Sequence, residues 1–213
     1  MSAQNLDNTK LDDSNSSVPD PVKESQSVLL NFLKNVSCQQ FSIKYASATN
    51  EEFVKPTNLS ADHWVASVIL PMAKVSVAFR VHFTSVQGRK VLATTKLQED
   101  LISPKNAHDS LKEYCNIVMG KLKAAVADEM QNGEMSNVFV PEMNPSYDNF
   151  GTVPSGDVVK ETWWRLVWEG GELICYGKAV TKEGFSPKTL EELNKDVSVV
   201  SFDDEGDVDF FDF

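Results

Sequence analysis

The residues of this chain that could do chemistry together lie between positions 109 and 123. They follow each other at spacings of four, three, four and three: Asp109, Glu113, Asn116, Gly120 and Lys123. On an α-helix of about 3.6 residues per turn these positions form one stripe, on which Glu113 and Asn116 are neighbours. A carboxylate and a carboxamide held side by side on a rigid helix can act on a group that docks there. The spacing also fits an ordinary solvated helix face, because such neighbours occur on every helix.

The stripe belongs to a predicted amphipathic helix. Apolar residues fall on roughly the opposite side, as a helix packed on a core requires: Leu111, Tyr114, Cys115, Val118, Leu122 and Ala125. Ser103-Pro104 is a typical helix start, with a serine N-cap before a proline in the first turn. We expect the helix to end near Met130, before Asn132-Gly133.

The rest of the sequence contains no self-contained catalytic pattern. It has no HExxH motif, no cluster of histidine with cysteine, no glycine-rich phosphate loop and no G-x-S-x-G. The three cysteines are odd in number and widely spaced, which is typical of reduced cytoplasmic thiols: Cys38, Cys115 and Cys175. An enzyme of this sequence would therefore borrow part of its active site from another molecule.

The net charge of −11 is concentrated at the two ends of the chain. Residues 1–20 carry four Asp and one Lys, and residues 203–213 carry five Asp and one Glu with no base, which leaves −2 for the body. A nearly neutral body without a basic stripe argues against nucleic-acid binding. No stretch approaches the ~20 apolar residues of a membrane span, and the first residues do not resemble a secretory signal.

A helix and a strand are expected in the first part of the body. Asp20-Pro21 predicts a helix start, followed by a buried stripe of Leu29, Phe32, Leu33 and Val36. Alternation of apolar and polar residues predicts a strand over 41–45, and residues 46–61 resemble a loop.

Strands dominate the middle and the end of the body. Residues 64–70 and 75–83 are expected to pair as antiparallel strands. Residues 85–97 fit a helix capped by Thr84 or Ser85, although Gly88 and the β-branched residues also fit a strand. A short strand at 138–140 and a loop at 142–158 precede a hairpin of 162–168 with 173–181, turned by Gly170-Gly171. The predicted fold class is α+β: a mostly antiparallel sheet with two long helices and a shorter one packed on it.

The helix at 104–130 resembles the CheC/CheX/FliY family of chemotaxis phosphatases. Asp109-x3-Glu113-x2-Asn116 matches the family pattern, and the continuation to Gly120-Lys121-Leu122 is similar to the CheX type. The resemblance covers residues 20–182. It leaves residues 1–19 as a disordered N-terminal segment and residues 183–213 as an acidic, aromatic C-terminal tail.

The resemblance implies a cytoplasmic enzyme that dephosphorylates the aspartyl phosphate of a CheY-type response regulator. Asn116 would orient the attacking water, and Glu113 would pair with the regulator's lysine. Mg²⁺ would come from the regulator, not from this chain. A homodimer is implied by the same resemblance. The alternative is a non-catalytic module that docks a receiver domain or a flagellar switch component.

Further residues of the helix are candidates for partner docking: Asp109, Ile117, Met119, Gly120 and Lys123. Ile117 and Met119 flank the polar stripe and could give it apolar contact with the partner. The C-terminal residues 202–213 combine six acids with four phenylalanines. They could insert into a basic, apolar pocket of an unknown partner, or form a disordered solvated tail.

Overall fold

The computed structural model describes residues 21–56, 62–71, 75–95, 97–126, 142–144 and 158–181 of the 213-residue chain. The predicted N-terminal segment 1–19, the C-terminal tail 183–213, the strand at 138–140 and the helix beyond Val126 lie outside these residues. So do the outermost residues of the predicted domain, 20 and 182.

Within the described ranges, six strands form one sheet in the order β1-β5-β6-β3-β2-β4. Every described pairing between neighbours is antiparallel. The strands are β1 (Thr49–Glu52), β2 (His63–Pro71), β3 (Val75–Thr84), β4 (Glu142–Asn144), β5 (Val158–Trp168) and β6 (Gly171–Thr181). Short strands occupy both edges, which limits the unpaired backbone that the sheet offers to other chains.

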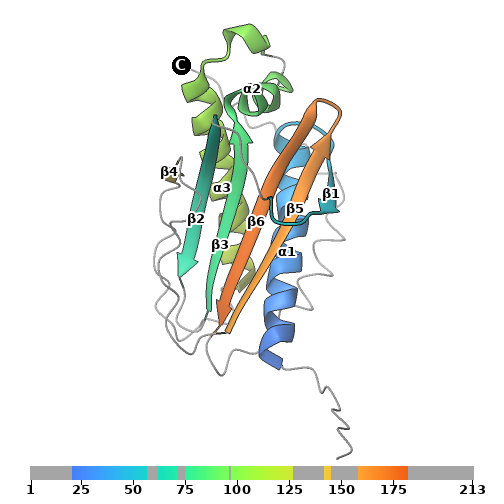
Figure 1. Cartoon of the computed structure of the whole chain (residues 1–213), viewed down its shortest axis with the longest axis vertical. Helices are drawn as coiled ribbons and strands as arrows, with labels where there is room; N and C mark the ends of the chain where they lie inside the picture. Colours follow the sequence, from blue (N-terminus) through green and yellow to red (C-terminus); the bar gives the residue numbers. More distant parts are fainter. Residues whose placement is uncertain are drawn as a thin grey trace, which may run out of the picture.

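Two long helices cover one face of the sheet, behind the strands in Figure 1. The helix α1 (Pro21–Lys44) packs on β5 and β6, and α3 (Pro104–Val126) packs on β2 and β3. These two helices also pack against each other, while the short helix α2 (Ser85–Ala93) contacts α3 at one end of the sheet. The predicted α+β class, with two long helices and one shorter one, is confirmed.

Aromatic side chains fill the space between α1, α3 and the sheet. Phe41 and Tyr114 meet edge to face with ring centroids 5.9 Å apart, and Phe79 stacks on Trp164 at 5.9 Å. The Tyr114 hydroxyl donates to the carbonyl of Ser37 at 2.7 Å. Because α1 and α3 share this buried contact, the exposed face of α3 has a fixed orientation relative to α1.

The predicted strand at 41–45 is wrong, because α1 continues to Lys44. The alternation of Phe41, Ile43 and Tyr45 that suggested it places Phe41 and Tyr45 four residues apart, and this spacing also puts both on one side of a helix. Both rings are buried in the core, whereas Ile43 is 60% exposed. Packing against the aromatic core outweighs the local preference of a β-branched residue for strands.

Two predicted loops also contain short strands. The range 46–61 includes β1, and the range 142–158 includes β4. These strands have few apolar residues and no clear alternation, so their pairing with β5 and β2 was not visible in the sequence. The strands expected at 64–70 and 75–83 are confirmed.

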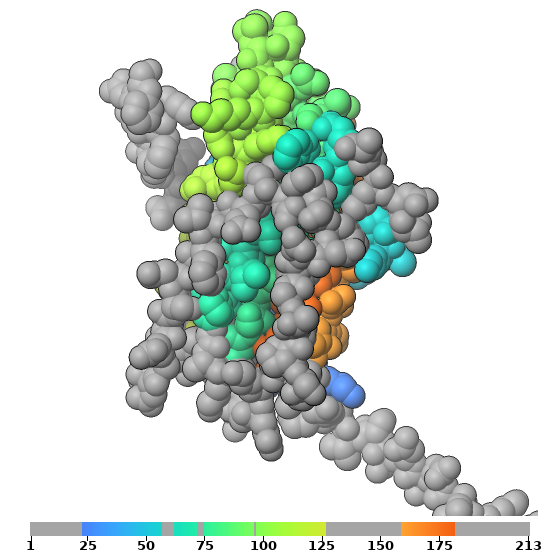
Figure 2. All heavy atoms as spheres, turned by 60° about the vertical axis from the view of Figure 1, so that its left-hand side comes forward, coloured from blue at the N-terminus to red at the C-terminus, as the bar shows by residue number. Residues whose placement is uncertain are grey.

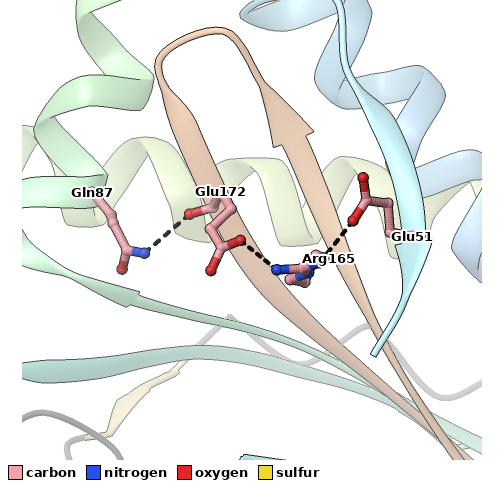
Figure 3. Close-up of polar contacts among 4 residues, drawn as sticks. All are labelled: Glu51, Gln87, Arg165 and Glu172. Atoms are coloured by element: carbon pink, nitrogen blue, oxygen red, sulfur yellow. Dashed lines mark hydrogen bonds and ion pairs between the residues drawn. The ribbon is translucent and has the colours of Figure 1, made fainter. Parts of the chain in front are cut away.

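The helix expected in 85–97 is confirmed as α2 and capped by Thr84, but it ends at Ala93, earlier than predicted. The Thr84 hydroxyl accepts from the Gln87 amide, while the Gln87 side chain accepts from the Thr84 amide. Gln87 also donates to the Glu172 carbonyl at 3.1 Å, and so joins α2 to the hairpin of β5 and β6 (Figure 3). Gly171 of this hairpin has φ +154°, a region that suits glycine.

Arg165 connects the same hairpin to the edge of the sheet. It lies between the carboxylates of Glu51 on β1 and Glu172 on β6, at 2.8 and 3.0 Å (Figure 3). The predicted hairpin is confirmed, and Trp164, Leu166 and Trp168 share its buried face as expected.

Candidate functional site

The first turn of α3 is fixed by the residue before it. The Ser103 hydroxyl accepts a hydrogen bond from the Asn106 amide at 3.1 Å, as expected of an N-cap serine. Figure 2 shows the segment around the start of α3, in yellow-green, as an exposed end of the molecule. The helix then runs to Val126 with one face on the sheet and α1.

The inner face of α3 is fully apolar, apart from the hydroxyl of Tyr114. Its buried residues include all of the predicted stripe except the half-buried Ala125: Ala107, Leu111, Tyr114, Cys115, Val118, Met119, Leu122 and Val126. Burial of this many large side chains fixes the rotation of the helix about its axis. The opposite stripe therefore has no freedom to turn inward.

The polar stripe faces outward as a consequence. Asp109, Glu113, Asn116 and Gly120 are all exposed. Within the described residues, the side chains of Glu113 and Asn116 make no hydrogen bond or ion pair, whereas Asp109 pairs with Lys112 at 3.2 Å. An unengaged carboxylate and carboxamide one turn apart can accept a cation and hold a water molecule for a docked partner.

The end of α1 lies beside this stripe, which the sequence did not reveal. The Tyr45 hydroxyl bonds to both the carbonyl and the hydroxyl of Ser110, one turn before Glu113. Lys44 lies over the Tyr45 ring, with Nζ 5.7 Å from the ring centroid. Burial lowers the pKa of Lys44, and the nearby Glu113 carboxylate opposes that shift. Because residues 41–45 were predicted as a strand, nothing in the pattern placed Lys44 near Glu113.

Met119 is not available for docking, contrary to expectation. It is fully buried in the core, because it lies four residues after Cys115 and three before Leu122 and so falls on their stripe. Ile117 and Lys123 are half-buried and border the exposed stripe. The structure thus brings together all the proposed docking residues on one surface except Met119.

The histidines do not form a catalytic or metal cluster with the exposed stripe. His63 Nε2 and His82 Nδ1 are 3.0 Å apart on β2 and β3, and His108 of α3 packs on the rings of Trp64 and Phe83. Among the described residues there is no group of three or more His, Cys, Asp or Glu that could hold a metal ion.

The thiols are equally unsuited to nucleophilic chemistry. All three cysteines are free, and Cys115 and Cys175 are fully buried. Burial raises the pKa of the Cys115 thiol far above its usual range, so that it stays protonated and unreactive. Its position on the apolar stripe is therefore structural.

No helix within the described part of the chain is long and apolar enough to cross a membrane. No protein-family model matches the sequence, and no curated protein matches it.

Solved structures resemble this chain in fold. A CheC-like superfamily protein from Shewanella sp. PV-4 superposes with a TM-score of 0.51 at 11% identity, and the match covers 73% of this chain and 97% of that protein. The chemotaxis protein CheX from Vibrio vulnificus gives a TM-score of 0.49 at 12% identity over 73% of this chain and 99% of CheX.

A third match is a chain from the CheX-CheY-BeF3-Mg²⁺ complex of Borrelia burgdorferi. It gives a TM-score of 0.48 at 12% identity and covers 76% of this chain and 99% of its own. The antiparallel sheet with its long helices agrees with the first of these superpositions over nearly the whole length of the matched protein. This chain has the fold of CheC-like superfamily proteins.

Proposed function

We propose that this protein is a CheX-like phosphatase that hydrolyses the aspartyl phosphate of a CheY-type receiver domain. The single observation that carries this proposal is the outward placement of Glu113 and Asn116. They lie one turn apart on α3, exposed and without a partner in the described residues. Their spacing, Glu113-x2-Asn116, is also the part of the sequence that resembles the CheX type.

The reaction needs positioning more than a strong base. Asn116 presents a donor and an acceptor together, so it can hold a water molecule in line with phosphorus without itself being ionised. The water oxygen bonds to phosphorus while the bond from phosphorus to the aspartate oxygen breaks. The products are inorganic phosphate and the free aspartate carboxylate, and the protons of the water pass to solvent and phosphate.

Glu113 would fix the docking geometry by pairing with the receiver's lysine. An exposed carboxylate that has no ion pair in the described residues is ready for that contact. The contact between Glu113 and the receiver's lysine would be bordered by Asp109, Ile117, Gly120 and Lys123. By the same resemblance, Mg²⁺ would be supplied by the receiver, and no step is routed through a metal of this chain.

A cytoplasmic location and a homodimer belong to the same proposal by resemblance. The alternative function is a binding module that docks a receiver domain or flagellar switch component without hydrolysis. The same exposed helix would serve it, since docking needs Glu113 but not the water-holding role of Asn116.

The decisive experiment times phosphate loss from phosphorylated receiver domains in the presence of this protein. Asn116→Ala should slow the accelerated loss by about 100-fold, because the water is no longer held in line. Its stability should change by less than about 0.5 kcal/mol, since the side chain is exposed. Asn35→Ala, at an exposed asparagine of α1, is the matched control and should retain full activity.

If Asn116→Ala removes phosphate as fast as the wild type, the proposed role is wrong. If the wild type binds the receiver without accelerating phosphate loss, the binding module is the correct function.

A further inference from the structure

Among the described glycines, Gly120 is the one whose lack of a side chain is explained neither by a close neighbour nor by its backbone conformation. A Cβ at Gly88 would lie 3.2 Å from the Ala107 Cβ, and one at Gly177 would lie 3.0 Å from Leu30 Cδ2. Gly170 lies under the Trp168 ring, and Gly171 has a positive φ. At Gly120 a Cβ would meet nothing within 4 Å.

Glycine at this position weakens the helix. Gly120 lies inside α3, six residues before its described end, where glycine is less favourable than any residue except proline. An alanine there would favour the helix without touching any neighbour. A residue that lowers stability and serves no internal contact points to an external requirement.

The requirement follows from the length of the Asn116 side chain. Its amide is only two carbons from the main chain, so it can reach a group recessed in another protein only if the surface of α3 comes very close. Gly120 is four residues beyond Asn116 and is therefore its neighbour on the same line of the helix. A side chain at position 120 would stand beside Asn116 and hold a partner away from it.

We propose that Gly120 is a clearance residue, which lets the main chain of a receiver domain contact α3 closely enough for Asn116 to enter the receiver's active site. This inference rests on the proposed function. It makes Gly120 a positioning residue, since it acts through Asn116 and touches no reacting atom.

The test compares Gly120→Ala and Gly120→Gln with the wild type. The probe is the CheY-type receiver set of the same genome, loaded with beryllofluoride and Mg²⁺ to stand in for the phosphorylated state. Both variants should unfold at higher temperature, by about 2–4 °C for alanine, because helix propensity improves. Receiver binding should weaken by about 5- to 100-fold, and more for Gln than for Ala, as overpacking of an interface requires.

Gly88→Ala is the matched control, because the same substitution is made where a Cβ would press on Ala107. It should leave receiver affinity unchanged, because Gly88 is buried and its added Cβ would meet only Ala107 and Phe83. A loss of affinity confined to the Gly120 variants would show that the loss is not a general result of replacing a helical glycine by alanine.

Other outcomes overturn the inference in distinguishable ways. If the wild type binds a receiver and both Gly120 variants bind it equally well, clearance is wrong while the proposed function stands. If the wild type binds no receiver, both fail together. If the Gly120 variants change only the molar mass in light scattering, the face packs against a second copy of this chain, and the receiver assignment is wrong.

Discussion

The Tyr45 hydroxyl lies 2.7 Å from Ser110 Oγ and 2.9 Å from the Ser110 carbonyl oxygen. This contact fixes the end of α1 against α3 one turn before Glu113. It explains why a cation of α1, Lys44, lies beside the carboxylate that would receive the receiver's lysine. Lys44 and Glu113 form no ion pair within 4 Å. The positive charge of Lys44 therefore weakens the attraction of Glu113 for another cation but leaves the carboxylate free to pair with it.

Lys44→Gln should therefore strengthen the binding of a receiver through its lysine. We expect the affinity to rise by about 2- to 4-fold at low ionic strength, the range of a partly exposed charge interaction, and to return to wild type at about 0.5 M salt. Titration of beryllofluoride-loaded receiver at several salt concentrations measures this. Lys105→Gln, at an exposed lysine near the start of α3, should show a smaller change. A weaker complex with Lys44→Gln would mean that Lys44 itself contacts the partner.

Truncation of Met119 should mainly lower stability, whereas truncation of Ile117 should mainly weaken receiver binding. Met119→Ala removes a fully buried side chain and should lower the free energy of unfolding by about 2–5 kcal/mol, while the folded fraction still binds receiver normally. Ile117→Ala should lower it less, because Ile117 is half-buried, but should weaken receiver binding. Urea unfolding and receiver titration of both variants decide this. Equal binding losses from the two would contradict the placement of Met119 in the core.

The periodicity of apolar residues correctly predicted those elements whose pattern fits only one kind of secondary structure. The stripe from Leu111 to Leu122 has one apolar side, so its burial follows from the sequence. In β3 the alternating apolar residues are buried as expected, but Ala78, Arg80 and His82 between them are buried too. Periodicity failed at 41–45, where the apolar residues fit a helix and a strand equally well. Tertiary contact of Phe41 with Tyr114 and Trp168 decided between them.

The site was predictable only in its own helix. Glu113 and Asn116 are three residues apart, so their proximity needs no tertiary information. The position of Lys44 depends on how α1 ends, and the role of Gly120 depends on the empty space around it. Residue spacing predicts neither property, because both depend on how segments far apart in the sequence pack together.

Acid should destabilise the fold through His82. This buried residue of β3 stacks on His63, and burial, with the nearby positive charges of His63 and Arg80, lowers its pKa to about 3. The unfolded chain has a histidine pKa near 6.5. Between these values the unfolded state takes up the proton first, so stability is complete above about pH 6.5 and falls as the pH drops toward 3. Lowering the pH from about 7.5 to about 5.5 should cost about 1.4 kcal/mol from this residue.

Urea unfolding of His82→Gln at the same two pH values tests this expectation. The variant should be less stable than the wild type at pH near 7.5, because a well-packed buried ring is lost, but it should lose about 1.4 kcal/mol less on acidification. His108→Gln is the control: burial also lowers the pKa of His108, but Asp109 and Asp62 oppose the shift, so its removal should alter the pH dependence less. An unchanged pH dependence in His82→Gln would show that protonation of other groups in the unfolded chain drives the acid sensitivity.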